Sequence, residues 1–165
     1  KYADQQNVSK SEAERILSDF DAKVPFVKVL SDRCATLADT RGWIRTIGGR
    51  RRHFNLWEPR FSERESPPMT YDKALKAYRG QTLRRFGTRK ALNSLIQGSA
   101  ADMTKRTMVR VWKELKLVPT LQVHDELDIC IDSPETMDRV KAIAESAYDM
   151  QVPIVADCKT GAHWS

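Results

Sequence analysis

The sequence predicts an α+β fold in which a β-hairpin and a closing strand pack on a long helix. Apolar residues recur at helical spacing through much of residues 88–116. Two short apolar stretches, Leu121–Val123 and Leu127–Ile131, flank a polar His-Asp-Glu cluster. Strand-like stretches on either side of a short polar cluster are the pattern of a hairpin. A helical stretch precedes these elements in residues 9–42.

The first 42 residues predict two helices. Ser9 is a suitable N-cap, and Glu12 stands where the acid of a capping box belongs. Pro25 ends this helix or starts the next one, because proline lacks a backbone N–H. The second helix is expected from about residue 26 to 39, with Gly42 closing it. Its expected inward residues are Val27, Leu30, Cys34, Leu37 and Ala38.

The middle of the chain predicts two strands, residues 43–47 and 53–57, around the turn Gly48-Gly49. Residues 59–68 are expected to form a polar surface loop. A helix is expected from Tyr71 to Arg85, with Gly80 as a possible interruption.

The long helix is expected from residue 88 to 116, with Pro119 stopping it. Glycine inside a helix costs roughly 1 kcal/mol relative to alanine, so Gly98 indicates close approach of another backbone, with the predicted hairpin strands as the candidate. Ser133 and Pro134 predict the start of a further helix, and residues 152–158 predict a closing strand. The apolar stripe expected along the long helix consists of Leu92, Leu95, Ile96, Met103, Met108, Val111, Trp112 and Leu115.

Composition indicates one compact globular chain with a polyanionic partner. The chain has 165 residues, 41% hydrophobic and 30% charged, with a net charge of +6. A generally basic surface would give the same net charge. No apolar run approaches the length of a membrane span. The cysteines, Cys34, Cys130 and Cys158, are scattered, which favours a reducing compartment over a disulfide framework.

Two neighbouring acids, Asp125 and Glu126, fall where the hairpin should turn. Their mutual repulsion opposes ionisation of both unless a cation compensates. Mg²⁺ prefers oxygen ligands held on a rigid turn, which points to phosphoryl-transfer chemistry. The alternative for an isolated acidic pair is a solvated turn. A metal-dependent nuclease is disfavoured, since it needs several converging carboxylates.

Polar residues spaced four apart, Arg89, Asn93 and Gln97, are expected on one side of the long helix. Such a row could contact the acceptors that every base pair presents in the minor groove; the alternative is a solvated face. Two basic groups flank the row and are expected at phosphates. They comprise Arg50, Arg51 and Arg52, and then Arg84, Arg85, Arg89 and Lys90. A third group, Lys105, Arg106, Arg110, Lys113 and Lys116, is expected to be solvated.

Several segments, in order, resemble motifs of the family A (DNA polymerase I-like) DNA polymerases of bacterial or phage type. Residues 122–127 resemble the last catalytic motif, residues 93–102 the long palm helix and residues 47–52 the Gly-Arg-Arg turn. Residues 152–155 and 161–164 are similar to the closing strand and tail. The resemblance implies a helical remainder of the fingers in residues 1–42 and a C-terminal palm portion in residues 43–165, with an insertion at about 59–81.

The resemblance also implies a function. Asp125 would be a metal ligand for a two-Mg²⁺ site, Glu126 a supporting carboxylate and His124 a group that positions the primer terminus. Arg89, Asn93 and Gln97, with Arg50 and Arg51, would contact primer–template DNA, and deoxynucleoside triphosphates would be the substrates. The compartment would be the cytoplasm of a bacterial cell or phage-infected host.

Two patterns of these polymerases do not occur in the sequence: the strand with the first catalytic Asp, and the fingers helix that grips the nucleotide. We therefore expect these 165 residues to be inactive alone and to need the missing N-terminal polymerase portion, from the same longer chain or a separate subunit. The alternative is a non-catalytic nucleic-acid-binding module derived from a polymerase.

Overall fold

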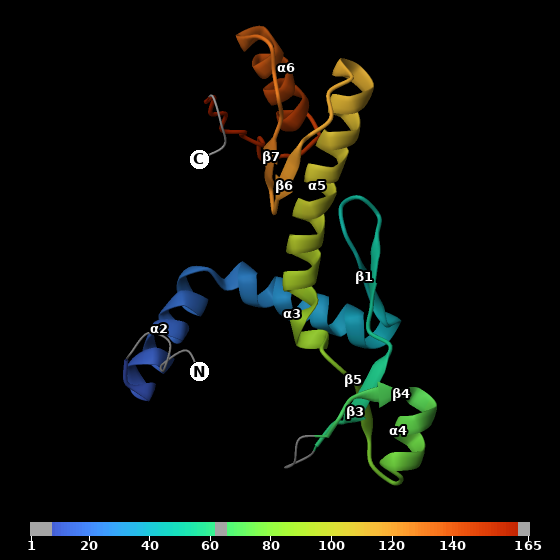
Figure 1. Cartoon of the computed structure of the whole chain (residues 1–165). Helices are drawn as coiled ribbons and strands as arrows, with labels where there is room; N and C mark the ends of the chain where they lie inside the picture. The colour runs from blue at the N-terminus through green and yellow to red at the C-terminus, as the bar shows by residue number, and fades with distance from the viewer. Residues whose placement is uncertain (1–7, 62–65, 162–165) are drawn as a thin grey trace. The chain divides into compact units, whose positions relative to one another are not determined.

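The computed structural model describes residues 8–61 and 66–161. Two compact units are present: Lys1–Ile44 with Arg51–Ser94, and Arg45–Arg50 with Leu95–Ser165. The course of the chain through both units is shown in Figure 1. The predicted α+β class is confirmed, since helices alternate with small antiparallel sheets. The predicted division at residue 42 into fingers remainder and palm portion stays a prediction.

The two N-terminal helices begin and end close to where local signals predict. Helix α2 spans Lys10–Lys23, and the backbone N–H of Glu12 donates to its N-cap Ser9 at 3.2 Å. Helix α3 spans Pro25–Arg41 and closes at Gly42, whose φ of 78° is left-handed. Cys34 and Ala38 are buried, whereas Leu30 is 40% exposed, so the expectation that Leu30 points inward is wrong.

The predicted second strand is divided in the structure. β1 (Trp43–Arg45) pairs with β2 (Arg51–His53), whereas β3 (Leu56–Pro59) belongs to a separate sheet of order β4-β3-β5. The Phe54 N–H donates to the Gly42 carbonyl at 2.8 Å, which continues the pairing of β1 with β2, so Phe54 belongs with the first hairpin and not with β3.

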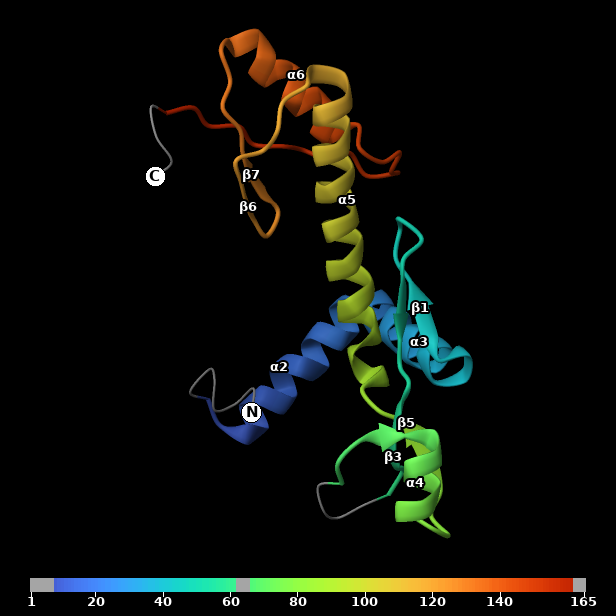
Figure 2. The ribbon, with the colours of Figure 1, turned by 45° about the vertical axis from the view of Figure 1, so that its right-hand side comes forward.

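The predicted helix over residues 71–85 is wrong in its second half. β4 (Met69–Thr70) leads into α4 (Tyr71–Ala77), and β5 (Leu83–Arg85) is a strand antiparallel to β3. Gly80, with φ of 82°, is left-handed and reverses the chain between them. The polar loop predicted at residues 59–68 includes residues 62–65, which lie outside the described residues. Figure 2 shows α4 lying against this small sheet.

The long helix α5 spans Ala91–Leu115, preceded by the short 3-10 helix η1 (Thr88–Lys90). Val111 is fully buried, but Ile96 and Trp112 are 54% and 51% exposed, so the predicted apolar stripe is wrong at both. Lys116, with φ of 60°, takes a left-handed conformation directly after the helix and before Pro119.

The remaining elements belong to the second unit. β6 (Leu121–Val123) and β7 (Glu126–Asp128) form the predicted hairpin, and α6 (Pro134–Glu145) starts at the predicted cap Ser133. Arg110 of α5 donates to the Ser146 carbonyl at 2.8 Å, fixing the end of α6. Residues 152–158 form no strand, because no neighbouring strand pairs with them, and this prediction is wrong. Most of the tail at 161–164 lies outside the described residues.

Cys34, Cys130 and Cys158 are free thiols. Burial raises the pKa of the Cys34 thiol, although Arg33 opposes this effect. Over residues 8–61 and 66–161, no helix has the combination of length and apolar character that crossing a membrane requires.

Candidate functional site

The acidic cluster occupies the tip of the β6–β7 hairpin. Val123 pairs with Glu126, so His124 and Asp125 alone form the turn. The His124 backbone is left-handed, with φ of 55°, and its carbonyl accepts a bond from Gln122 Nε2 at 3.0 Å. The side chains of His124 and of the two acids, Asp125 and Glu126, are all exposed. A two-residue turn therefore presents Asp125 to solvent from a fixed backbone.

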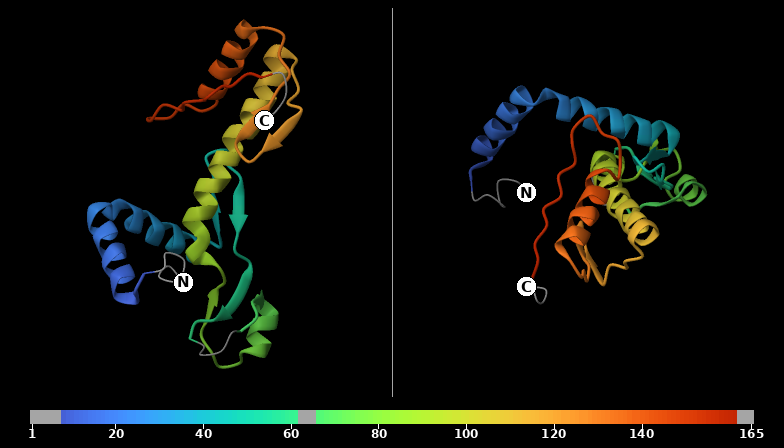
Figure 3. Two further views of the ribbon diagram at one scale, coloured as in Figure 1. Left: turned by 60° about the vertical axis from the view of Figure 1, so that its left-hand side comes forward. Right: turned by 90° about the horizontal axis from the view of Figure 1, so that it is seen from above.

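This hairpin runs beside α5, as Figures 1 and 3 show from different directions. The hairpin and residues 95–115 of α5 belong to the second unit, whereas residues 91–94 of α5 belong to the first. The hairpin thus lies beside part of α5, and a shared site of the acidic turn and the polar row of Arg89, Asn93 and Gln97 stays a prediction.

The carboxylates of Asp125 and Glu126 are suitable ligands for a hard divalent cation. Within the described residues, no group of three or more His, Cys, Asp and Glu side chains is placed to hold a metal ion. The donor type fits Mg²⁺, but the ligand number does not complete a site. Further ligands would have to come from other residues, from the substrate or from water.

The expected polar row is only partly helical. Arg89 lies in η1, so it does not continue the α-helical spacing of the other two residues. Asn93 and Gln97 are both exposed on α5, one turn apart. The amide pair thus has the predicted spacing, whereas the side from which Arg89 projects, one residue before the end of η1, stays a prediction.

A buried carboxylate that the sequence motifs gave no role lies in the second unit, where α5 meets the turn between β1 and β2. Asp102 on α5 is 7% exposed and accepts bonds from Thr46 Oγ1, from Arg50 Nε and, at 3.0 Å, from the Gly48 backbone N–H. Burial alone would raise the pKa of Asp102, but these bonds and the Arg50 charge together lower it. Asp102 is therefore held as an anion beneath the turn that joins β1 to β2.

Further contacts fix this turn to α5. Arg50 Nη2 donates to the Gly98 carbonyl at 2.9 Å, and the Ile47 N–H donates to Ser99 Oγ at 3.1 Å. A Cβ on Gly48 would lie 2.6 Å from Asp102 Oδ2, and a Cβ on Gly98 would lie 2.6 Å from Thr46 Cγ2. Gly98 is closely approached, as the sequence indicates, but by the Thr46 side chain and not by the backbone of the predicted hairpin strands, so that part of the expectation is wrong. An acid in mid-helix beside small residues was the available signal for Asp102.

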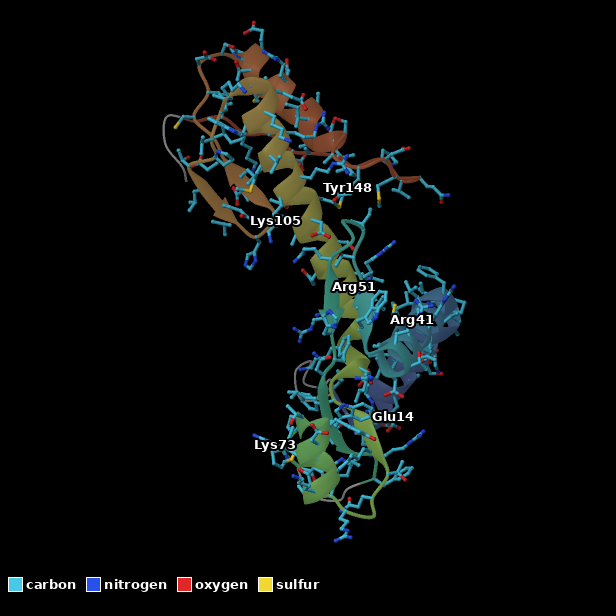
Figure 4. The ribbon with its side chains drawn as sticks, turned by 90° about the vertical axis from the view of Figure 1, so that its right-hand side faces the viewer. Glu14, Arg41, Arg51, Lys73, Lys105 and Tyr148 are labelled. Carbon is cyan, nitrogen blue, oxygen red and sulfur yellow. The ribbon has the colours of Figure 1, made fainter. Side chains whose placement is uncertain are left out.

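The predicted DNA-contacting arginines differ in how free they are. Arg50 is committed to Asp102 and Gly98, although half of its side chain stays exposed. The Arg51 guanidinium lies 4.4 Å from the Trp43 ring centroid in a cation–π contact. Figure 4 shows Arg51 among the side chains of its strand. DNA contact by these two residues stays a prediction.

Arg84 and Arg85, expected at phosphates, have internal partners. Arg84 Nε donates to Glu58 Oε1 at 2.9 Å. Arg85 lies 4.5 Å from the Trp57 ring centroid and donates to the Asp39 carbonyl at 3.0 Å. Both arginines hold strands β3 and β5 in place, which the sequence does not reveal.

Comparison with known proteins shows that this chain is similar to the members of one family. The family model described as DNA polymerase family A matches residues 1–165. DNA polymerase I of Caldicellulosiruptor bescii is 33% identical over 167 residues, covering 95% of this chain and 17% of that protein. A DNA-directed DNA polymerase of Pseudomonas phage M6 is 32% identical over 153 residues, covering 93% of this chain and 19% of that protein.

A solved structure is also similar, that of the POL domain of Pol1 from M. smegmatis in complex with DNA primer-template and dNTP. It has a TM-score of 0.68 and 27% sequence identity, covering 92% of this chain and 25% of that chain. The chain spans less than a fifth of the length of the two relatives above. Because the family model matches the chain from end to end, the chain belongs to DNA polymerase family A.

Proposed function

We propose that this chain is the C-terminal fingers and palm portion of a template-directed DNA polymerase, which binds primer–template DNA and deoxynucleoside triphosphates. The observation that carries the proposal is the exposed Asp125 on a two-residue turn beside α5. The match to DNA polymerase family A over all residues supports it. The complex named for the M. smegmatis structure supports DNA and a nucleotide as ligands.

In this proposal Asp125 supplies one carboxylate ligand for Mg²⁺, and Glu126 supports it. When bound, the metal ions lower the pKa of the primer 3′-hydroxyl and neutralise the triphosphate. His124 positions the primer terminus from the same turn. Arg89, Asn93 and Gln97 contact the DNA, with Arg50 and Arg51 near its phosphates.

Activity requires more carboxylate ligands than the hairpin provides. We therefore expect no nucleotide incorporation by these 165 residues alone, with catalysis only when a further polymerase portion completes the metal site. A primer-extension assay on the isolated chain tests this, and sustained incorporation would refute it.

The role of Asp125 is tested by Asp125→Asn in a polymerase that contains this segment. Extension should be abolished, while the Kd for primer–template DNA changes little. Asp128→Asn is the matched control, since Asp128 lies in the same hairpin on β7 but outside the acidic turn. It should keep most of the activity.

Full activity of Asp125→Asn would reject the assigned role. Salt-sensitive DNA binding with no dependence on Mg²⁺ or Asp125 would favour a non-catalytic nucleic-acid-binding module instead.

A further inference from the structure

The segment between β2 and α5 carries most of the chain's excess charge. Residues 56–90, here called the insertion lobe because they contain the insertion expected at about 59–81, have nine Lys or Arg and four Asp or Glu, in a chain whose net charge is +6. Its described part consists of β3, β4, α4, β5 and η1. So small a lobe cannot pair this many cations with its own four acids, so we expect the cations at its surface to bind an anionic partner.

Five of the nine basic residues of the lobe fall into two sets that differ in whether they have internal partners. Arg84 and Arg85 have internal partners, the first Glu58 and the second Trp57 and backbone carbonyls. In contrast, Lys73, Lys76 and Arg79 are exposed. Within the described residues, none of these three lies within 4.0 Å of a carboxylate. They are therefore available to an external anion.

The helix presents these cations on its outer side. Ala74 of α4 is fully buried, and Tyr71 packs against Trp57 of β3 with ring centroids 4.8 Å apart. Positions 73 and 76 are three residues apart and fall on the side of the helix opposite Ala74. Figure 4 shows Lys73 at the outer edge of α4. Lys73 and Lys76 thus form one basic face, which Arg79 extends beyond the helix end.

The lobe also has an exposed aromatic residue. Phe61, the second residue after β3, is 81% exposed, and the Arg60 guanidinium lies 5.8 Å from its ring centroid. The Arg60 backbone N–H donates to the Thr82 carbonyl at 2.8 Å, which ties this end of β3 to the segment before β5. Aromatic rings with neighbouring arginines are platforms on which unpaired bases stack.

We propose that the insertion lobe is a second DNA-binding surface, in which Lys73, Lys76 and Arg79 contact phosphates and Phe61 stacks on an unpaired base. It binds the single-stranded part of a primer–template in preference to the duplex. This inference rests on the proposed polymerase function, and it assigns to the lobe a role separate from that of the Asn93/Gln97 pair.

The test is fluorescence anisotropy with labelled single-stranded, duplex and primer–template oligonucleotides over a series of salt concentrations. In the K73Q/K76Q/R79Q variant, the slope of log Kd against log salt should fall by about 2 to 3, since each phosphate contact contributes about 0.7 to 0.9. Phe61→Ala should weaken single-strand binding at least about fivefold, as expected for one stacked base, and leave duplex binding unchanged.

The matched control is K105Q/K113Q/R139Q, which removes the same charge from exposed positions outside the lobe. It should lower the slope by less than one unit. An equal loss in the control, or an unchanged slope in the lobe variant, would overturn the inference. Equally strong binding of the wild-type chain to anionic phosphatidylserine vesicles would do so as well.

Failure of the inference and failure of the proposed function give different results. If the wild-type chain binds no primer–template at all, the proposed function fails. If it binds and the lobe variants bind identically, the inference alone fails.

Discussion

Replacing Gly98 with alanine should destabilise the chain, although alanine is the better helix former. An added Cβ would lie 2.6 Å from Thr46 Cγ2, against a favourable carbon–carbon separation of about 3.5–4.0 Å. Thr46 cannot turn its methyl group away without cost. Its hydroxyl bonds Asp102 and accepts from the Arg50 N–H at 3.2 Å.

The expected change in the free energy of unfolding for Gly98→Ala follows from two opposing effects. Overpacking a tight contact costs about 1–3 kcal/mol, whereas replacing a helical glycine with alanine gains about 1 kcal/mol. The net loss for Gly98→Ala is therefore about 1 kcal/mol, the difference between these effects. Thr46→Ser removes the methyl group and keeps the hydroxyl. In that background the next atoms, Thr46 Cβ and Arg50 Nη2, lie at 3.9 Å, an ordinary contact.

Gly98→Ala should therefore stabilise the Thr46→Ser chain by about 1 kcal/mol. Equilibrium urea unfolding of the wild type, the two single variants and the double variant gives the coupling energy between Gly98→Ala and Thr46→Ser, expected to be about 2 kcal/mol. Amide exchange at Gly48, whose N–H bonds Asp102, reports locally on the same contact. If Gly98→Ala has the same sign in both backgrounds, the close approach is not what requires glycine.

Three further changes test other contacts by urea unfolding. Asp102→Asn should lower the free energy of unfolding by about 1–3 kcal/mol at pH 7. The folded-state pKa of Asp102 lies below the ordinary 3.8, so the stabilisation by the ionised carboxylate is complete above pH 3.8. It is lost as the pH falls through the folded-state pKa. A loss that does not diminish at all as the pH falls below 3.8 would contradict this assignment. Glu114→Gln, which removes an exposed ion pair with Arg110, should cost less than about 0.5 kcal/mol, and a loss three times larger would be inconsistent with a solvated pair. Ser133→Ala should cost about 1 kcal/mol by removing the cap bond from the Thr136 N–H; an unchanged unfolding midpoint would show that the cap is dispensable.

Helix boundaries were predictable because their signals are local. Ser9 and Ser133 cap helices through N–H groups three residues ahead, and Pro25 occupies a first turn that needs no N–H. Gly42 supplies the left-handed conformation that ends α3. Each of these depends on neighbours a few residues away.

Strands were predicted less well, because a strand exists through its partner. Residues 83–85 pair with β3 although their spacing resembles a helix, and residues 152–158 have the apolar content of a strand but no partner. The hairpin at residues 121–128 was predicted correctly, since its partner lies two residues away across a turn.

The sequence alone determined the family resemblance, the acidic turn at Asp125 and the excess of basic residues, because these are properties of residues close together in the chain. Only the tertiary structure decides which Lys and Arg side chains have no internal partner. Arg50 meets Asp102 and Arg85 meets Trp57 only after the chain folds, across separations of 52 and 28 residues. A charge that finds an internal partner is unavailable to DNA, and that partner is set by packing rather than by spacing.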